Sequence, residues 1–188
     1  MRVLGISGSL RRDSHNTRLL RAAAFELPPG AELELYEQLA AVEPYSEDHD
    51  GDSSPPGASA LRTAITRADA LLIATPEYNS SIPGQLKNAL DWASRPYATN
   101  ALRAKPAAVI GASSGIFGAV WAQAEVRKVL GAIGAQVLED EVPVGQAHGA
   151  FAADGSLADP RLRELLAGTV AALVDAARRA EVIEAATS

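Results

Sequence analysis

The chain has 188 residues, and apolar residues make up 47% of it, which indicates one folded domain with a substantial core. Its formal net charge of -6 argues against nucleic acid or an anionic membrane surface as a partner. The absence of cysteine excludes disulfides, thiolate metal sites and thiol catalysis. We expect a single domain over residues 1–188, in the cytoplasm, without a membrane span or a metal site.

Short apolar runs alternate with segments of helical periodicity along the chain. In chain order, the pattern predicts a strand at 3–7, a helix at 17–26, a strand at 32–36, a loop at 43–57, a helix at 59–68, a strand at 70–75, a helix at 83–94, a strand at 107–111, a helix at 118–130, a strand at 135–138 and a helix at 161–184. Buried strands that alternate with helices form a parallel sheet covered on both faces. The fold class is therefore α/β, a three-layer sandwich with a five-stranded parallel sheet in the order 2-1-3-4-5.

Three loops with unusual sequences follow the first, third and fourth of these strands. In a doubly wound sheet the carboxyl ends of parallel strands lie at one edge, and ligands bind there. We therefore expect the three loops to form a single ligand site.

The first loop, Gly8 to Thr17, joins a strand to the start of a helix, where backbone N–H groups and the helix dipole attract an anion. Arg11 adds a guanidinium that can bind a phosphate through two hydrogen bonds. The other polar candidates are Ser9, Ser14, Asn16 and Thr17. The loop contains no lysine and no Gly-x-Gly-x-x-Gly pattern, so it is neither a Walker A loop nor a dinucleotide fingerprint. An ordinary helix cap at Ser14 with solvated arginines is the competing interpretation.

The second loop runs from Thr75 to Gly84 and contains two prolines that restrict its backbone. Tyr78 and Asn79 come just after a buried strand, where they can contact a flat aromatic ligand. A turn that leads into a helix with proline in its first turn explains the same residues.

The third loop, Gly111 to Gly118, has three glycines, which allow close approach of the backbone to a ligand. It also matches the Gly-x-Ser-x-Gly pattern of serine hydrolases, with Ser113 as nucleophile and Asp140 and His148 later in the chain. A hydrolase of this kind would leave the first two loops without a function. His15 and His148 are otherwise expected to be cap or surface residues.

Taken in series, these motifs resemble the NADPH-dependent FMN reductase family, which includes bacterial quinone, chromate and azo reductases with a flavodoxin-like fold. The resemblance rests on motifs spread over most of residues 3 to 130: Gly8-Ser9-Leu10-Arg11 with Ser14 and Asn16, Pro76-Glu77-Tyr78-Asn79, Ile82-Pro83-Gly84, Leu86-Lys87-Asn88-Ala89-Leu90-Asp91-Trp92, and the glycine-rich third loop.

The resemblance implies which residues bind FMN. The phosphate would be bound by Ser9, Arg11, Ser14, Asn16 and Thr17. The ribityl chain and the isoalloxazine ring would contact Pro76, Glu77, Tyr78 and Asn79. The pyrimidine side of the ring would contact Ser113, Ser114 and Gly115. By contrast, Lys87, Asn88, Asp91 and Trp92 would support the fold or a subunit interface.

The resemblance also implies the reaction. NADPH or NADH would transfer hydride to FMN and leave, and a small-molecule acceptor (a quinone, an azo compound, a metal oxyanion or free flavin) would then be reduced. No protein acid or base is needed for hydride transfer, so we assign no catalytic residue. Members of the family are commonly homodimers or homotetramers. A flavodoxin-type electron carrier without a substrate of its own is the alternative.

Overall fold

A computed structural model describes residues 1–51 and 54–187 of the chain. Its parallel sheet has the order β2 (Glu32–Tyr36), β1 (Arg2–Ser7), β3 (Ala70–Thr75), β4 (Pro106–Ala112), β5 (Gln136–Val137). The predicted order 2-1-3-4-5 is thus confirmed, and it is the flavodoxin-like arrangement. A further short strand, β6 (Pro143–Val144), pairs with the carboxyl end of β4.

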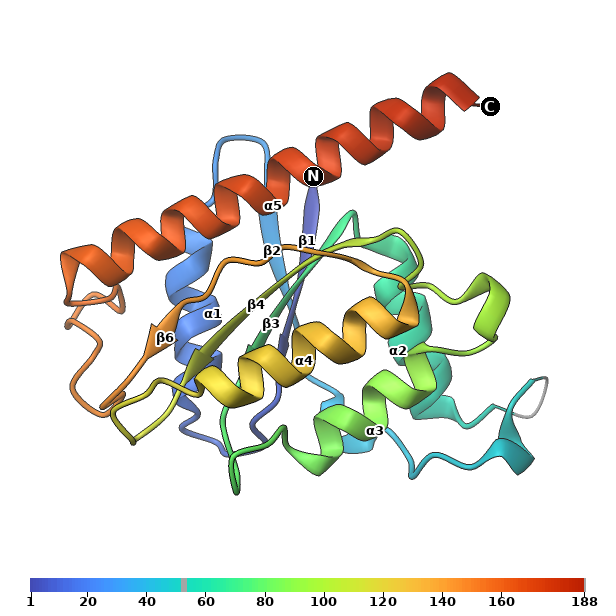
Figure 1. Ribbon diagram of the computed structural model, residues 1–188, viewed down its shortest axis with the longest axis horizontal. Helices are drawn as coiled ribbons and strands as arrows, with labels where there is room; N and C mark the ends of the chain where they lie inside the picture. The colour runs from blue at the N-terminus through green and yellow to red at the C-terminus, as the bar shows by residue number, and fades with distance from the viewer. Residues whose placement is uncertain (52–53, 188) are drawn as a thin grey trace.

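The helices form a layer on each face of the sheet (Figure 1). One face is covered by α1 (His15–Phe25) and α5 (Pro160–Thr187). The opposite face is covered by α2 (Pro56–Arg67), α3 (Gly84–Ala93) and α4 (Val120–Ile133). Short 3-10 helices occur at η1 (Leu39–Ala41), η2 (Glu47–His49) and η3 (Tyr97–Thr99). The predicted three-layer sandwich is therefore confirmed.

The burial of each strand explains its place in the sheet. Every residue of β3 and β4 is buried, as expected for central strands that are covered on both faces. In β3, Leu71 and Ile73 pack toward α2, α3 and α4, whereas Leu72 packs toward α1 and α5. Strand β2 alternates exposed and half-buried residues over most of its length, which is typical of an edge strand.

The segment predicted as a loop at 43–57 is more structured than its composition indicates. It contains η2, and α2 begins at Pro56, three residues before the predicted start. The carboxylate of Glu43 accepts hydrogen bonds of 3.2 Å from the backbone N–H groups of Gly57 and Ala58, and so caps the helix. A cap supplied from 14 residues upstream leaves no local sequence signal.

The end of the sheet also differs from prediction. The predicted strand at 135–138 is only two residues long, and β6 was not predicted because two residues carry no periodicity. Both strands pair with β4, β5 near its start and β6 at its end. Strand β6 consequently lies beside the loop that follows β4.

Helix α3 carries the motif Leu86 to Trp92, and one of its faces packs against the chain around Glu43. The Asn88 Nδ2 and the Trp92 Nε1 both donate to the Glu43 carbonyl, at 2.9 Å and 2.8 Å, and the Asn88 Oδ1 accepts from the Tyr45 N–H at 2.7 Å. Asn88 and Trp92 therefore support the fold. None of the helices in the described ranges combines the length and the apolar character needed to cross a lipid bilayer.

Candidate functional site

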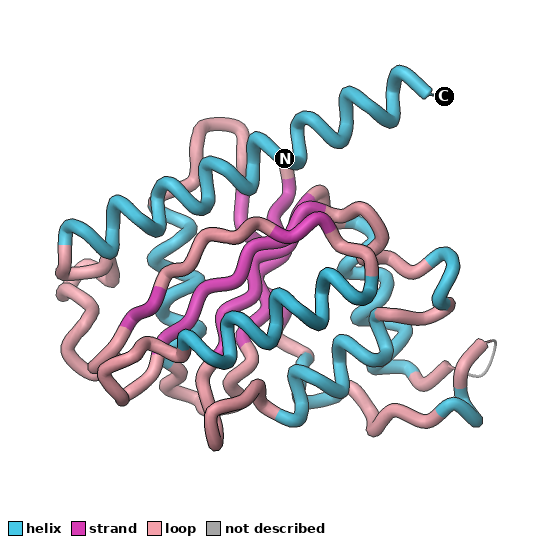
Figure 2. The backbone as a smooth tube through the Cα atoms, viewed as in Figure 1, coloured by secondary structure: helices cyan, strands magenta, loops and turns pink. Residues whose placement is uncertain are grey.

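The loops that follow β1, β3 and β4 lie at the carboxyl edge of the sheet, as their positions after parallel strands require (Figure 2). They enclose a hollow of about 90 Å³. It is lined by Ser9, Arg11, His15, Asn16, Pro76, Glu77, Tyr78, Ala112, Ser113 and Ser114. The structure thus brings residues of all three predicted loops together. Of the predicted site residues, those that do not line this hollow are Ser14, Thr17, Asn79 and Gly115.

The start of α1 offers unpaired N–H groups to this hollow. Ser14 is the N-cap, with its Oγ accepting from the Thr17 N–H at 3.2 Å and its carbonyl accepting from Arg18 at 3.0 Å. Within the described chain, the N–H groups of His15 and Asn16 donate to no protein acceptor. Two free donors at a helix start form an anion-binding position. Ser14 therefore shapes this position rather than lining it.

Arg11 lies in the exposed part of the same loop. Its Nη2 donates to the Asp13 carbonyl at 3.4 Å, and no carboxylate forms an ion pair with it in the described residues. The guanidinium is therefore available to an anion in the hollow, which it lines.

Asn16 occupies a different position from the one that its place in the loop indicates. Its side chain is 1% exposed, its Nδ2 donates to the Ala112 carbonyl at 2.9 Å, and its Oδ1 accepts from the Ala112 N–H at 2.9 Å. This pair of bonds fastens the start of α1 to the end of β4. The side chain of Asn16 thus connects two of the loops, and its backbone N–H has no protein acceptor in the described residues.

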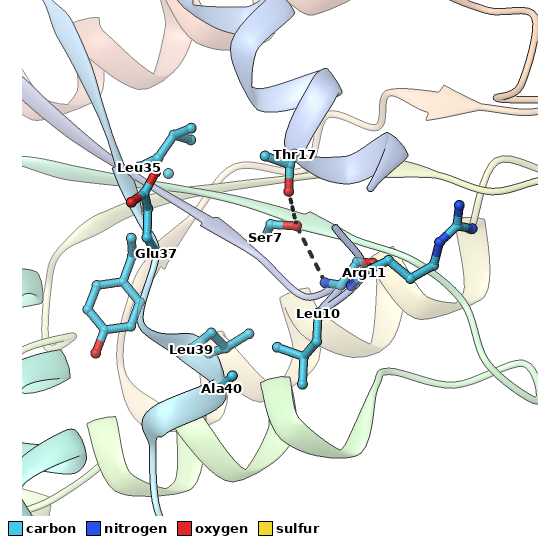
Figure 3. Close-up of a pocket in the computed structure, with 11 residues that line it drawn as sticks. Ser7, Leu10, Arg11, Thr17, Leu35, Glu37, Leu39 and Ala40 are labelled. Atoms are coloured by element: carbon cyan, nitrogen blue, oxygen red, sulfur yellow. Dashed lines mark hydrogen bonds between the residues drawn. The ribbon is translucent and has the colours of Figure 1, made fainter. Parts of the chain in front are cut away.

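Ser7, the last residue of β1, organises the other side of the first loop. Its Oγ accepts from the Thr17 hydroxyl at 3.1 Å and from the Ser9 N–H at 3.4 Å, which folds the loop around it (Figure 3). Ser7 is not among the site residues that the sequence predicts. The signal for Ser7 in the sequence was its position as a hydroxyl residue at the end of a mostly apolar strand.

The second loop lies against the first. The Gly8 N–H donates to the Ala74 carbonyl at 2.8 Å, and a Cβ on Gly8 would lie 2.9 Å from a methyl group of Leu86 and 3.3 Å from the Pro76 ring. Glycine thus allows the close contact between the loops. Pro76 is buried at this contact and lines the hollow.

Beyond Pro76 the chain makes a tight turn. Tyr78 and Ser81 exchange two backbone hydrogen bonds of 3.1 Å, and the two residues between them, Asn79 and Ser80, have φ angles of 54° and 59°. Two successive positive φ angles define a type I′ turn. The turn leaves Tyr78 half exposed beside the hollow, while Asn79 stands at the exposed tip.

Glu77 contacts the helix that follows the third loop. Its Oε2 accepts from the Ala122 N–H at 3.1 Å, in the first turn of α4. This contact caps the N-terminus of α4. The N-cap residue, Ala119, makes no side-chain hydrogen bond that could do so. Glu77 therefore connects the second loop with the helix that follows the third.

The third loop is fixed by the segment around β6. Ser113 donates its N–H to Val144 at 3.0 Å and accepts from Ala147 at 3.0 Å, and the Gly115 carbonyl accepts from Gln146 at 2.8 Å. In the described residues, the N–H groups of Ser114, Gly115 and Ile116 donate to no protein acceptor. The loop thus turns carbonyl groups to the protein and leaves N–H donors for a ligand.

The triad of the alternative hydrolase interpretation is not assembled in the described residues. The Ser113 hydroxyl donates to the Gly115 carbonyl at 3.4 Å, and Asp140 and His148 are both exposed. Within the described ranges, no hydrogen bond joins these three side chains, so no base is positioned to activate Ser113.

A second cavity, of about 230 Å³, lies on the other side of the first loop, between the ends of β1 and β2. Figure 3 shows Leu10 and Arg11 on one side of it and Leu35, Glu37 and Leu39 on the other. It was not predicted, because a doubly wound sheet gives no reason to expect a cavity beside its edge strand.

Positive charge gathers at the start of α1. Burial lowers the pKa of His15, and the neighbouring charges of Arg11, Arg18 and His148 lower the pKa further, in that order. The His15 Nδ1 is buried without a hydrogen-bond partner in the described residues. This end of an acidic protein is therefore electrostatically suited to anions.

Comparison with known proteins gives a consistent result. The sequence profile of the NADPH-dependent FMN reductase family matches residues 1–149. An NAD(P)H-dependent FMN reductase of Pseudomonas aeruginosa is 44% identical over 174 residues, 92% of this chain and 93% of that protein. A quinone reductase of Pseudomonas putida is 37% identical over 84% of each chain. The solved structure of FerB, a flavoenzyme NAD(P)H:(acceptor) oxidoreductase of Paracoccus denitrificans, superposes with a TM-score of 0.83 at 39% identity, over 95% of this chain and 97% of that one.

Proposed function

The chain belongs to the NADPH-dependent FMN reductase family, and from this premise we propose that the three loops bind FMN with its phosphate at the start of α1 and its ring beside Tyr78 and Ser114. The protein is an FMN-dependent NAD(P)H oxidoreductase. Bound FMN supplies the redox chemistry, since it can accept a hydride from a nicotinamide and then reduce an acceptor. The convergence of unpaired N–H donors from two loops on one hollow carries this assignment.

The first loop fits a phosphomonoester. The N–H groups of His15 and Asn16 would donate to phosphate oxygens, with the hydroxyls of Ser9 and Thr17 beside them and the Arg11 guanidinium closing over the anion. Ser14 and the Asn16 amide would act by holding this arrangement.

The other two loops fit the flavin ring. Pro76 and Tyr78 would supply the apolar contact that a flat ring requires, and the turn at Asn79 and Ser80 would keep Tyr78 in place. The N–H groups of Ser114 and Gly115 would donate to the carbonyl oxygens of the pyrimidine, where negative charge develops on reduction. Glu77 would act indirectly, through its cap on α4.

We favour quinones as acceptors. The relative from Pseudomonas putida is a quinone reductase, and a flat quinone can occupy the same exposed flavin face as the nicotinamide once that has left. Transfer between flat rings needs no protein acid or base, in keeping with the lack of an assembled triad around Ser113 in the described residues. Azo compounds, metal oxyanions and free flavin are further candidates of the same electron-accepting character.

We also propose that the active form is a homodimer or homotetramer. Three large apolar side chains, Ile116, Phe117 and Trp121, stand exposed at the end of the third loop and the start of α4. The rings of Phe117 and Trp121 pack edge to face with centroids 5.1 Å apart. Such a patch beside a site is typical of a surface that a second copy covers.

The function is tested with the FMN-loaded protein under anaerobic conditions. Addition of NADPH should bleach the flavin absorbance, and subsequent addition of p-benzoquinone should restore it. Steady turnover of NADPH with the quinone, and no other protein present, distinguishes an enzyme from an electron carrier. A purified chain that binds no added FMN, or holds FMN that neither nicotinamide nucleotide bleaches, would overturn the proposal.

A further inference from the structure

Two arginines near the start of α1, Arg11 and Arg18, form no ion pair with a carboxylate in the described residues. The ion pairs of the described residues use Arg2, Arg62, Lys87, Arg95, Arg127 and Arg178. Arg11 and Arg18 take part in none of them, although the chain carries 23 acidic residues against 17 basic ones. Arg18 is therefore a guanidinium without a carboxylate partner in the described chain, and it lies near His15 and His148.

Arg18 is held in place by an aromatic ring. Its guanidinium carbon lies 4.4 Å from the centroid of the Phe151 ring, and the same ring stacks on His15 with an interplanar angle of 8° and a centroid distance of 6.5 Å. Phe151 pairs with Leu157 in a backbone bridge, so the ring stands on an ordered loop. A guanidinium stacked in this way loses little conformational freedom when it binds an anion.

The guanidinium of Arg18 adds positive charge that the FMN phosphate does not require. The proposed phosphate site already has Arg11, two helix N–H groups and the Ser9 hydroxyl, which satisfy one phosphomonoester. Arg18 and His148 are not needed for that anion. Arg18 contacts the same Phe151 ring as His15, which lines the hollow, and the Nδ1 of His15 is buried without a hydrogen-bond partner in the described residues.

Arg11 lines the cavities on both sides of the first loop, but the two sides differ in their carboxylates. The cavity between β1 and β2 carries the carboxylate of Glu37, which repels a phosphate. The carboxylate that lines the hollow, that of Glu77, is engaged with the start of α4. A second anionic group that enters the site would therefore lie on the side of Arg18.

Building on the proposed function, we propose that Arg18, with His15 and His148, binds the 2′-phosphate of NADPH and makes the protein prefer NADPH to NADH. NADPH and NADH differ only in this phosphomonoester, so a dedicated guanidinium beside the flavin site can discriminate between them. Phe151 acts as a positioning residue, because it holds Arg18 and His15 in the arrangement that meets the phosphate.

The test compares Arg18→Gln with wild type. We expect kcat/KM for NADPH to fall about tenfold or more, through a higher KM, while kcat/KM for NADH stays within about twofold, because a charge-assisted hydrogen bond to one phosphate is lost. Arg18→Lys should restore part of the preference, since it keeps the charge without the stacked plane. Arg21→Gln is the matched control: it removes the same charge from an exposed position one turn further along α1 and should leave both nucleotides unaffected.

Binding is measured independently of turnover. In isothermal titration calorimetry, 2′,5′-ADP should bind the FMN-loaded wild type more tightly than 5′-ADP does, and Arg18→Gln should abolish the difference. Equal use of NADPH and NADH by wild type, or a parallel loss for both nucleotides together with loss of FMN from Arg18→Gln, would overturn the inference. Failure of both nucleotides to reduce the flavin of wild type would instead overturn the proposed function.

Discussion

At the scale of single residues, the loop between β1 and α1 separates binding from positioning. Arg11 is exposed and has no carboxylate partner in the described chain, whereas the amide of Asn16 is buried and fully used by Ala112. Both residues belong to the same motif and both carry polar groups. Sequence alone assigns them the same role, because the contact that distinguishes them joins positions 96 residues apart.

This distinction gives a prediction for Arg11. Arg11→Ala should weaken FMN binding by about 1.5–3 kcal/mol, the range for a hydrogen bond to a charged group, without lowering the free energy of unfolding. Fluorescence titration of the apoprotein with FMN measures the affinity, and urea denaturation measures the stability. Arg12→Ala, at the exposed neighbouring position, is the control and should retain wild-type affinity. Unchanged FMN affinity in Arg11→Ala would place the phosphate elsewhere.

His15 predicts how stability depends on pH. Burial and the charges of Arg11, Arg18 and His148 lower the pKa of His15 below its ordinary value of 6.5 in the folded protein. The unfolded chain then binds a proton that the folded chain does not, so stability falls as the pH drops through 6.5 toward the folded pKa, and it recovers above 6.5.

The measurement is the urea midpoint of the apoprotein at about pH 7.5 and about pH 5.5. His15→Gln should lose less stability than wild type between these two values, because the group that resists protonation is gone. His49→Gln, at an exposed position on η2, should behave like wild type. An equal loss in His15→Gln and wild type would show that His15 does not contribute to the pH dependence.

At the scale of elements, the site depends on a segment that sequence analysis did not identify. Strand β6 and the residues after it hold the third loop through the backbone of Ser113 and Gly115. Gly145 lies where this packing is tightest, since a Cβ there would approach the Ile116 carbonyl oxygen to 2.4 Å. A backbone atom cannot rotate away, so the loop itself must move.

Gly145→Ala should therefore displace the third loop. We expect a loss of about 1–3 kcal/mol in stability, as for other overpacked positions, and weaker FMN binding, because the N–H groups of Ser114 and Gly115 shift. Gly149→Ala in the same segment is the control, since a Cβ there meets nothing within 4 Å. Flavin titration and thermal denaturation distinguish the variants. Wild-type FMN affinity in Gly145→Ala would mean that the third loop does not contact the flavin.

At the scale of the whole molecule, the sequence predicts the five main strands of the sheet. It does not predict the short strand β6 or the Glu43 cap on α2. Strand β3 matches its predicted bounds because a fully buried parallel strand is a continuous apolar run. Strand β6 and the Glu43 cap on α2 were missed because both depend on distant partners rather than on local pattern. The convergence of the three loops was predicted, since it follows from topology alone.

The same distinction between features set by local pattern and features set by distant contacts applies to the site. The hydroxyl of Ser7 and the Phe151 ring belong to its surroundings, yet neither stands in a recognisable motif. Their roles come from packing between segments far apart in the chain. We propose that residues 1–188 form one domain, because both apolar clusters lie against the same sheet.

The exposed aromatic patch gives a prediction about how copies of the chain assemble. Phe117 is 56% exposed and Trp121 is 50% exposed, and both come shortly after Ser113 and Ser114, which line the hollow. If a second copy covers this patch, a carboxylate buried in the interface would be costly, and Trp121→Glu should dissociate the assembly. Sedimentation velocity should then report one 19.5 kDa chain for this variant and a multiple of that mass for wild type.

Tyr97→Glu, which changes an exposed aromatic residue on η3, should assemble as wild type does. A wild-type protein that sediments as a single chain, or a Trp121→Glu variant that keeps the wild-type mass, would contradict an interface at this patch.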